Sequence, residues 1–301
     1  MNSFDLAIAY KWVHDRELTD QIEEKFHKNG LTTFVIGKHN VHEITDLVKN
    51  RKLAFQVYFD RASDEDEDFE TIANILTRRK TYIINNYQKV EIAIDKSIMH
   101  NKLIKHNFNL PGTIIIPPFD DTENITINDG QLSELGSPFI IKPAYYSGAG
   151  EGVVTNATSV EQILTERKKK SDDHYLVQQK IYPKLYKGKR TWFRSYYFFN
   201  DVYPVWWDDL SHSYEMIGYL EFKKLKLNDL INITYKLAAI TGLDYFSSEI
   251  ALSDVNKFIL IDYVNDQCDF RKKSKFNDGV PDEIVDIFIT EMMNKVNQTK
   301  K

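Results

Sequence analysis

The segment from residue 138 to 153, PFIIKPAYYSGAGEGV, combines a lysine with a glycine-rich loop. An apolar strand carries Lys142. Gly148 and Gly150 follow with the small Ser147, so the backbone there can approach a ligand closely. The amide N–H groups of such a loop can hold phosphates while the lysine supplies a positive charge. The segment therefore indicates a phosphate site, although a glycine-rich hairpin beside a surface lysine explains the same residues equally well.

The commonest phosphate-binding patterns are absent from the sequence. GxxxxGK followed by Ser or Thr does not occur, and no GxGxxG follows a first strand. P-loop and Rossmann sites are therefore excluded.

Two carboxylates and an asparagine lie in a second informative segment, toward the end of the chain. Glu249 lies in one predicted strand, Asp262 near the end of the next, and Asn265 three residues beyond. If the strands pair across their short turn, both carboxylates can face the same side with the Asn265 oxygen nearby. Such oxygen ligands suit Mg²⁺, which takes its other ligands from phosphates and water. A carboxylate after the apolar run FILI is costly to bury unpaired, which favours a metal site over a simple turn at Asp262.

The elements that position these residues begin with alternating strands and helices. Apolar segments at residues 4–10, 31–37 and 53–59 are predicted strands, with helices before Gly30 and at residues 41–50. This alternation is typical of a small parallel sheet with helices on its faces.

The helix after the third strand has a recognisable charge order. Ser63 is predicted to cap it, with the acidic residues 64–66 in its first turn and the basic residues 78–80 at its end. The acidic cluster is therefore interpreted as a helix start and not as a metal site. Asp60 and Arg61 stand at the carboxyl end of a parallel strand, where open α/β sheets bind ligands, and they are weaker candidates for substrate contact.

The remainder of the chain is predicted to be richer in strands, after one long helix at residues 90–108. The further predicted elements are strands at 81–86, 138–144, 175–181, 246–253 and 257–264, two antiparallel strands within 190–207, and helices at 159–170, 229–242 and 282–296.

Composition limits the class of protein. The 301 residues, 42% hydrophobic and 28% charged, are typical of a globular protein with a substantial core. The formal charge is -5 and no basic stripe occurs, so nucleic acid is not an expected partner. Cys268 is the single cysteine and cannot form an internal disulfide, which suits a reducing cytosol. With no signal peptide or membrane-spanning apolar run, we expect a cytoplasmic protein without a membrane partner.

In this order, the segments resemble the ATP-grasp superfamily of carboxylate–amine ligases, including its glutathione synthetase-like and RimK-like members. The resemblance covers nearly the whole chain and implies an α/β fold with α+β lobes. A pre-ATP-grasp domain with a parallel sheet would come first. The implied parts are residues 1–90 for this domain, 91–135 for a linker helix and the start of the ATP-grasp region, 136–184 for the central ATP-binding lobe and 185–301 for the C-terminal catalytic lobe.

The resemblance also implies that ATP and Mg²⁺ are the cofactors. IDKSIMHNKLIKHNF makes Lys96 or Lys102 the first phosphate-side lysine, and PFIIKP makes Lys142 the second. YSGAGEGV is similar to the family's lid over the phosphates, and YLVQQKI to the strand and hinge beside adenine. The residues implied to contact ATP are Lys96, Lys102, Lys142, Ser147, Gly148, Gly150, Gln179, Lys180 and Ile181.

The implied metal ligands are Glu249, Asp262 and Asn265, and Arg194 in RTWFRSYYFF is the implied phosphate-facing catalytic arginine. Two features depart from the family pattern. Asp262 and Asn265 are three residues apart where the family has two, which implies a bulge or makes Asp266 a competing ligand. VWWDDLSHSY stands where many ligases have a second arginine.

Arg271 is a second catalytic candidate. It follows the metal strand in the run CDFRKK and could bind an acidic group of the substrate. A solvated basic turn with the two lysines that follow is the alternative interpretation.

The implied reaction activates a substrate carboxylate as an acyl phosphate, which an amine then attacks. No protein nucleophile is required, in agreement with the absence of a Ser/His/Asp or Cys/His arrangement from the sequence. The expected partner is a small molecule or peptide with a carboxylate, and a homodimer would fit the family. Two alternatives stay open: a small-molecule kinase, which the basic run Lys184 to Arg190 favours, and a nucleotide-binding module without turnover.

Overall fold

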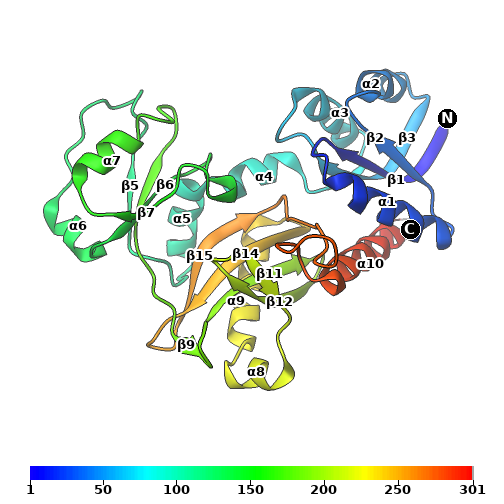
Figure 1. The fold of residues 1–301 in the computed structure, drawn as a ribbon. Coiled ribbons are helices and arrows are strands. Elements are labelled where there is room, and N and C mark those ends of the chain that lie inside the picture. Colours follow the sequence, from blue (N-terminus) through cyan, green and yellow to red (C-terminus); the bar gives the residue numbers. More distant parts are fainter. Residues whose placement is uncertain (300–301) are drawn as a thin grey trace. The chain divides into compact units, whose positions relative to one another are not determined.

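The chain folds into two compact units. Figure 1 shows the helices and strands that make them up. The computed structural model describes residues 1–299, apart from the side chains of Asp129 and Ala149. The first unit comprises Met1–Val90, Ser195–Ser247 and the chain from Asp266 onward, and the second comprises Glu91–Arg194 and Ser248–Asn265. The division into four parts that the sequence suggested stays a prediction.

A four-stranded parallel sheet forms the centre of the first unit. Its order is β2-β1-β3-β4, and the neighbouring strands are parallel. The strands are β1 (Asn2–Tyr10), β2 (Thr33–Ile36), β3 (Leu53–Arg61) and β4 (Tyr82–Ile84), and the connecting helices are α1 (Asp15–Lys28), α2 (Val41–Lys49) and α3 (Glu67–Arg78). The parallel α/β arrangement predicted from the sequence is confirmed.

Alternating side chains of the parallel strands point to the two faces of the sheet. On one face, Ala7 and Ala9 belong to a buried cluster with apolar residues of α2 and α3, such as Ile44 and Ile72. On the other face, Phe59 contacts Phe288 of α10 (Asp282–Thr299), with ring centroids 5.8 Å apart. Burying each Ile or Phe side chain contributes about 1.5–3 kcal/mol, so helices on both faces stabilise the sheet.

The carboxyl end of β3 holds a buried ion pair. Arg61 Nε and Nη2 donate to the two oxygens of Asp15 at 2.9 and 2.8 Å, and Nη2 also donates to the carbonyl oxygen of Cys268 at 3.1 Å. The side chains of Arg61 and Asp15 are only 2% and 4% exposed. Arg61 therefore stabilises the first unit, which favours a structural role over substrate contact.

Replacing Asp15 with Asn should lower the free energy of unfolding by about 3–5 kcal/mol, because the Arg61 guanidinium would stay buried without its counter-charge. Asp20→Asn is the matched control on the same helix. Asp20 pairs with Arg16 at 2.9 Å on an exposed surface, and its loss should change the free energy of unfolding far less. Urea unfolding followed by circular dichroism measures both variants. Equal losses would contradict the structural role of the buried pair.

The start of α3 differs from the prediction. The helix begins at Glu67 and its cap is Asp66, whose Oδ1 accepts from Asp68 N at 3.2 Å, so Ser63 is not the cap and residues 64–66 are not its first turn. The Ser63 hydroxyl instead donates to Asp60 Oδ2 at 2.7 Å. Asp60 is buried near the end of β3, and its Oδ1 also accepts from the backbone N–H groups of Ala62 and Ser63. The bond from the Ser63 hydroxyl to Asp60 therefore competes with helix capping.

The long helix predicted at residues 90–108 is two helices. α4 (Tyr87–Ile94) ends before Asp95, and α5 (Lys96–Lys105) begins after it. Asp95 Oδ1 accepts from the backbone N–H groups of Ser97 and Ile98 at 2.8 and 3.0 Å. A carboxylate that caps these amides starts a new helix, which the apolar periodicity alone did not reveal.

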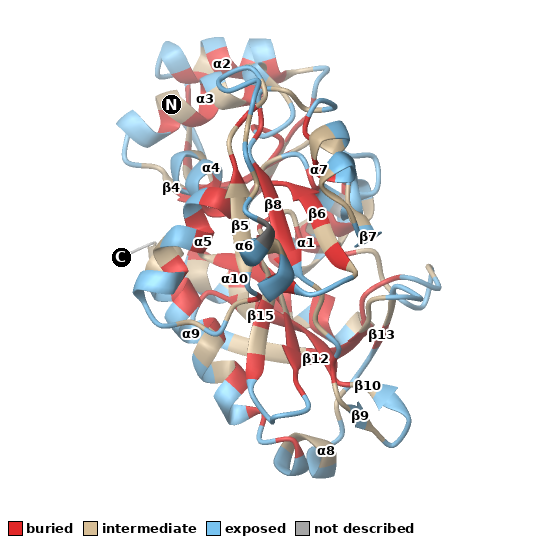
Figure 2. Ribbon diagram, turned by 90° about the vertical axis from the view of Figure 1, so that its left-hand side faces the viewer, coloured by how far each residue is buried: buried red, intermediate tan, exposed pale blue. Residues whose placement is uncertain are grey.

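The second unit contains a four-stranded antiparallel sheet of order β5-β8-β6-β7. The strands are β5 (Thr113–Ile116), β6 (Phe139–Pro143), β7 (Val154–Ala157) and β8 (Tyr175–Gln179), and the helices beside them are α6 (Asp129–Leu135) and α7 (Val160–Glu166). Figure 2 shows that β6 and β8 are largely buried. The sequence did not predict β7 or α6, and α7 is shorter than predicted because residues 167–170 form turns.

A five-stranded sheet has the order β13-β12-β11-β14-β15, and the boundaries of the units fall within β11 and β14. The neighbouring positions of β11 with β12 and of β14 with β15 agree with the predicted strand pairs. The remaining elements are β9 (Leu185–Tyr186), β10 (Lys189–Arg190), β11 (Trp192–Phe198), β12 (Asp201–Asp208), β13 (Ser213–Glu215), α8 (Tyr219–Lys224), α9 (Asn228–Thr241), β14 (Tyr245–Leu252) and β15 (Phe258–Asn265).

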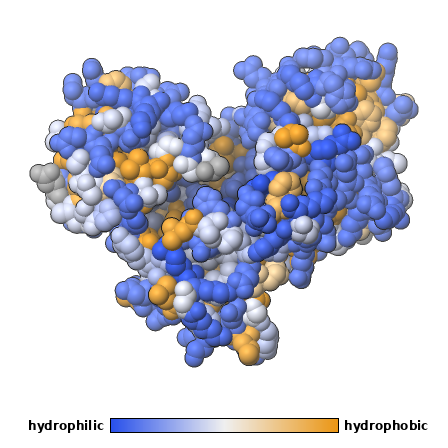
Figure 3. All heavy atoms as spheres, in the orientation of Figure 1, coloured by the Kyte–Doolittle hydropathy of each residue, from blue (hydrophilic) through white to orange (hydrophobic). Residues whose placement is uncertain are grey.

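Apolar side chains are scattered over the face of the molecule in Figure 3, which is mostly hydrophilic. None of the helices within residues 1–299 combines the length and the apolar character that crossing a membrane requires.

Candidate functional site

Two lysines converge on an aspartate in the second unit. Lys96 is the first residue of α5, Lys142 lies in β6 and Asp262 lies in β15. Lys96 Nζ is 3.6 Å from Asp262 Oδ1, and Lys142 Nζ donates to the carbonyl oxygen of Ile261 at 3.3 Å. Lys96 and Lys142 are 8% and 7% exposed. Buried lysines are rare unless a ligand or a partner requires them, so this cluster is the candidate site.

A backbone hydrogen bond links the start of α5 to the residue that follows β6. Lys96 N donates to the carbonyl oxygen of Ala144 at 3.1 Å. The cap by Asp95 orients the first turn of the helix, whose N–H groups carry a partial positive charge. The site therefore combines two ammonium groups with a helix N-terminus, an arrangement that favours anions.

The pKa values of Lys142 and Asp262 are both lowered, for different reasons. Burial lowers the pKa of Lys142 to about 8, although Asp262 attracts its ammonium group, and the charge of Lys96 adds to the lowering. For Asp262, burial acts to raise the pKa, but the charges of Lys96, Lys142 and Arg194 outweigh it and lower the pKa overall. Asp262 is therefore ionised at neutral pH.

A second carboxylate lies on the neighbouring strand. Glu249 of β14 accepts from Arg194 Nη2 through Oε1 and from Trp192 Nε1, at 3.0 Å, through Oε2. Trp192 and Arg194 are two residues apart in β11, so their side chains share one face of the sheet. These two donors hold the Glu249 carboxylate in one orientation.

Hydrogen bonds hold the start of the glycine-rich loop in place. Asp173 Oδ2 accepts from the backbone N–H groups of Tyr145 and Tyr146 at 2.9 and 3.2 Å. Gly150 has a φ of +81°, which a residue with a side chain rarely adopts. Ser147 is 7% exposed, and its Oγ has no hydrogen-bond partner among the described residues. Such a buried hydroxyl commonly signals a missing ligand or water.

The other candidates for ATP contact also belong to the second unit. Gln179 ends β8, and its N–H donates to Gly112 O at 2.8 Å. Lys180 Nζ donates to Asn156 Oδ1 at 2.6 Å, and Ile181 follows in a loop. Lys102 lies in the last turn of α5, so of the two lysines proposed from this helix it is Lys96 that pairs with Asp262.

Arg271 belongs to the first unit, whereas the residues of this cluster belong to the second. Its Nη2 is 2.7 Å from Asp269 Oδ2 and 2.9 Å from Asp278 Oδ2. Both partners are carboxylates, so the guanidinium already has its counter-charges within that unit.

Sequence reasoning missed a hydrogen-bonded group beside the cluster. His100 Nδ1 is 2.6 Å from the Tyr263 hydroxyl, and Gln178 Nε2 donates to the same hydroxyl at 3.3 Å. All three side chains are buried. The signals were the four-residue spacing of His100 from Lys96 and the position of Tyr263 directly after Asp262.

The cluster has oxygen atoms that fit Mg²⁺. Asp262 Oδ1 is inaccessible to solvent and accepts no hydrogen bond from the described residues. Glu249 accepts two bonds, but an ionised carboxylate offers about four acceptor sites, and Asn265 ends the same strand as Asp262. No group of three or more His, Cys, Asp or Glu that could hold a metal occurs within the described part of the chain. Phosphates and water would therefore supply most ligands, as Mg²⁺ commonly requires.

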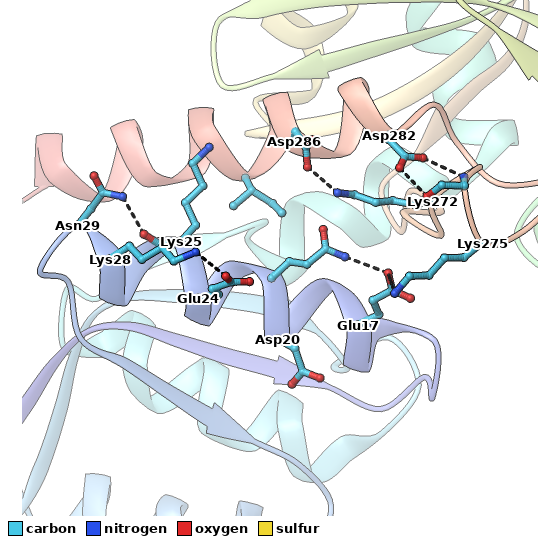
Figure 4. Close-up of a pocket in the computed structure, with 13 residues that line it drawn as sticks. Glu17, Asp20, Glu24, Lys25, Lys28, Asn29, Lys272, Lys275, Asp282 and Asp286 are labelled. Carbon is cyan, nitrogen blue, oxygen red and sulfur yellow. Dashed lines mark hydrogen bonds and ion pairs between the residues drawn. The ribbon is translucent and has the colours of Figure 1, made fainter.

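A pocket of about 750 Å³ lies in the first unit, between α1 and α10 (Figure 4). Its charged side chains pair with one another, as in Lys272–Asp286 at 2.6 Å and Lys275–Glu17 at 2.8 Å. Carboxylates and lysines occur there in nearly equal numbers, so the pocket favours neither an anion nor a cation.

Comparison with known proteins identifies the fold. No protein-family model and no curated protein matches the sequence. Among solved structures, a D-alanine–D-alanine ligase from Bacillus anthracis complexed with ATP is similar over 97% of this chain and 98% of its own, with a TM-score of 0.67 and 15% identity. The chain has the ATP-grasp fold.

Two further ATP-grasp structures are similar over nearly their whole length. The ATP-grasp ligase PsnB, complexed with a minimal precursor, Mg and ADP, is similar over 99% of both chains, with a TM-score of 0.63 and 12% identity. An ATP-grasp RimK domain protein from Sphaerobacter thermophilus is similar over 95% of this chain and 98% of its own, with a TM-score of 0.61 and 16% identity. The ATP-grasp fold predicted from the sequence, with its N-terminal parallel sheet, is confirmed.

Proposed function

We propose that this ATP-grasp chain is a ligase that uses ATP and Mg²⁺ to activate a substrate carboxylate for attack by an amine. The observation that carries the proposal is the convergence of two buried lysines on the ionised Asp262 carboxylate. Similarity to ligases complexed with ATP, or with Mg and ADP, supports the choice of cofactors. The substrate would be a small molecule or a peptide with a carboxylate.

Lys96 and Lys142 would bind the phosphates of ATP, and the loop with Ser147, Gly148 and Gly150 would cover them. Residues 179–181 would contact the adenine. Positioning and neutralisation of charge by these groups are the main requirements of phosphoryl transfer.

In the first step an oxygen of the substrate carboxylate forms a bond to the γ-phosphorus and the bond to ADP breaks. In the second, the amine nitrogen attacks the acyl carbon, and phosphate leaves while the nitrogen loses its proton. Arg194, 9% exposed and paired with Glu249, would stabilise negative charge on the transferred group. Mg²⁺ held by Glu249, Asp262 and Asn265 would neutralise charge on the phosphate oxygens.

A small-molecule kinase is the second candidate, favoured by a cationic hairpin. β9 and β10 pair antiparallel and carry Lys184, Lys187, Lys189 and Arg190 on or beside them. Such a cluster would attract a phosphorylated substrate. A nucleotide-binding module without turnover is the third candidate. The cytoplasmic location and the homodimer stay predictions.

Mass spectrometry of a metabolite extract incubated with the protein, ATP and Mg²⁺ separates these functions. A ligase produces a mass equal to two substrates less water together with ADP, whereas a kinase adds phosphate to one metabolite. The Glu249→Gln, Asp262→Asn double variant should produce neither product. If the native chain binds ATP but forms no ADP, the catalytic proposal is wrong and the binding module is right.

Nucleotide affinity should decrease as the pH rises above about 8. The Lys142 ammonium is present below its pKa of about 8 and is lost above it, so binding of a phosphate at higher pH requires uptake of a proton. We expect the Kd for ADP to rise by up to about tenfold per pH unit between pH 8 and 9. Titration calorimetry at pH 7, 8 and 9 measures this. Lys142→Arg keeps its charge and should lose the dependence, and a constant Kd for the native chain would disprove the assignment.

A further inference from the structure

The hydroxyl group of Tyr263 connects three elements that carry proposed nucleotide-binding residues. It belongs to β15, next to Asp262, and it contacts His100 of α5 and Gln178 of β8. Tyr263, Gln178 and His100 are 0%, 2% and 3% exposed, so water does not compete for these bonds. Buried polar groups of this kind hold their neighbours in one arrangement only if every member is satisfied.

The donors and acceptors in this group are determined by chemistry. Gln178 Nε2 can only donate, and it donates to the Tyr263 hydroxyl and to Thr113 Oγ1, at 3.3 and 2.9 Å. The Tyr263 hydroxyl therefore accepts from Gln178, and its own proton remains for His100 Nδ1, 2.6 Å away, when that nitrogen carries no proton. His100 accepts this bond as a neutral imidazole with its proton on Nε2. Burial and the charge of Lys142 lower the pKa of His100 to about 4, which agrees with the neutral form.

His100 and Lys96 lie on the same face of α5, because four residues are about one helical turn. They contact consecutive residues of β15, His100 at Tyr263 and Lys96 at Asp262. The position of α5 along β15 thus sets both contacts together. A shift of the helix that breaks the bond between His100 and Tyr263 would also change the separation of Lys96 and Asp262.

The edge of β15 is bonded to the chain segment that follows α5. β15 is the last strand in the sheet order, and Leu260 N donates to Asn109 O at 3.0 Å. Asn109 Nδ2 also donates to Phe258 O, at 3.3 Å. These bonds fix the segment after α5 against β15, and the bond between Tyr263 and His100 links β15 to α5 itself.

We infer that Tyr263, His100 and Gln178 are positioning residues that hold Lys96 against Asp262 and so determine the affinity for nucleotide without touching it. The inference rests on the proposed binding of nucleotide at Lys96 and Lys142. Tyr263 acts through its hydroxyl, whereas its ring, with the centroid 5.9 Å from Lys142 Nζ, remains in a phenylalanine variant.

Tyr263→Phe tests this inference by titration calorimetry with ADP and Mg²⁺. The Kd should rise about tenfold, as expected when a group that orients a ligand-binding residue is lost. In a Lys96→Ala background the same change should have no further effect on Kd, because Lys96 is the residue through which Tyr263 acts. Tyr245→Phe is the matched control, since it removes a buried hydroxyl in the first unit that accepts from Arg61 at 3.5 Å. It should leave Kd unchanged.

His100 offers an independent pair of variants if Tyr263→Phe does not fold. His100→Leu removes the acceptor and should raise Kd by a similar factor, whereas His100→Asn places an acceptor oxygen where Nδ1 was and should stay close to the native value. Native affinity in Tyr263→Phe and His100→Leu, whatever their melting temperatures, would overturn the inference alone. An equal rise in Kd with and without Lys96 would also overturn it. A native chain that binds no ADP would overturn the proposed function together with the inference.

Discussion

Replacing Asp262 with Asn should lower the rate of ADP formation by about 10³-fold, with little change in shape at the site. The change removes the negative charge that pairs with Lys96 and that, in the proposed reaction, helps to hold Mg²⁺ on the phosphates. It also leaves Lys96 and Lys142 close together without that carboxylate, which should lower the melting temperature moderately. ADP formed from ATP in the presence of the metabolite extract measures the rate.

Asp254→Asn is the control for this variant. Asp254 lies in the exposed turn between β14 and β15, and its Oδ1 accepts from Val255 N at 2.9 Å. The Asp254→Asn variant loses one negative charge from the same strand pair, but it should retain the native rate of ADP formation. If Asp254→Asn and Asp262→Asn slowed ADP formation equally, Asp262 would have no special part in the reaction.

Replacing Lys142 with Ala should raise the Kd for ADP by about 10- to 100-fold, because a hydrogen bond to a charged group contributes about 1.5–3 kcal/mol. The variant should not show a loss of stability that matches its loss of affinity. Burial lowers the pKa of Lys142 to about 8, which means that folding places its charge in an unfavourable environment. A residue retained for binding is expected to show this combination of lost affinity and an unchanged or raised melting temperature.

Lys169→Ala is the matched control in the same unit. Lys169 is 60% exposed and pairs with Glu166 at 2.7 Å, so it removes an ammonium group that faces solvent. Its Kd for ADP should equal the native value. A Lys142→Ala chain that binds ADP normally but melts much earlier would show that Lys142 is structural.

Local sequence patterns were sufficient for several parts of the fold. Short apolar runs and the helices between them predicted the parallel sheet, because each element depends mainly on its own periodicity. The turn at the end of α9 was predicted from Gly242, which adopts a φ of +66°. Lys142 with its glycine loop, and Asp262 after an apolar run, were recognisable as candidates for the same reason.

Competing local bonds explain the errors at helix ends. Asp66 caps α3 in place of Ser63, whose hydroxyl bonds to Asp60. Asp95 divides one predicted helix into α4 and α5. At each of these helix starts, several nearby Asp and Ser side chains could form the capping hydrogen bond. The bonds that their neighbours make determined which one did.

The sequence by itself determined which residue types could do the chemistry: two lysines, a glycine-rich loop, and carboxylates on adjacent strands. Only the tertiary structure decided which of them meet. Packing of α5 beside β15 brings Lys96 to Asp262 while Lys102 lies at the other end of the helix, and Arg271 pairs with two carboxylates of the first unit. The physical reason is distance along the chain, since contacts between residues 96, 142 and 262 depend on how whole elements pack and leave no trace in local periodicity.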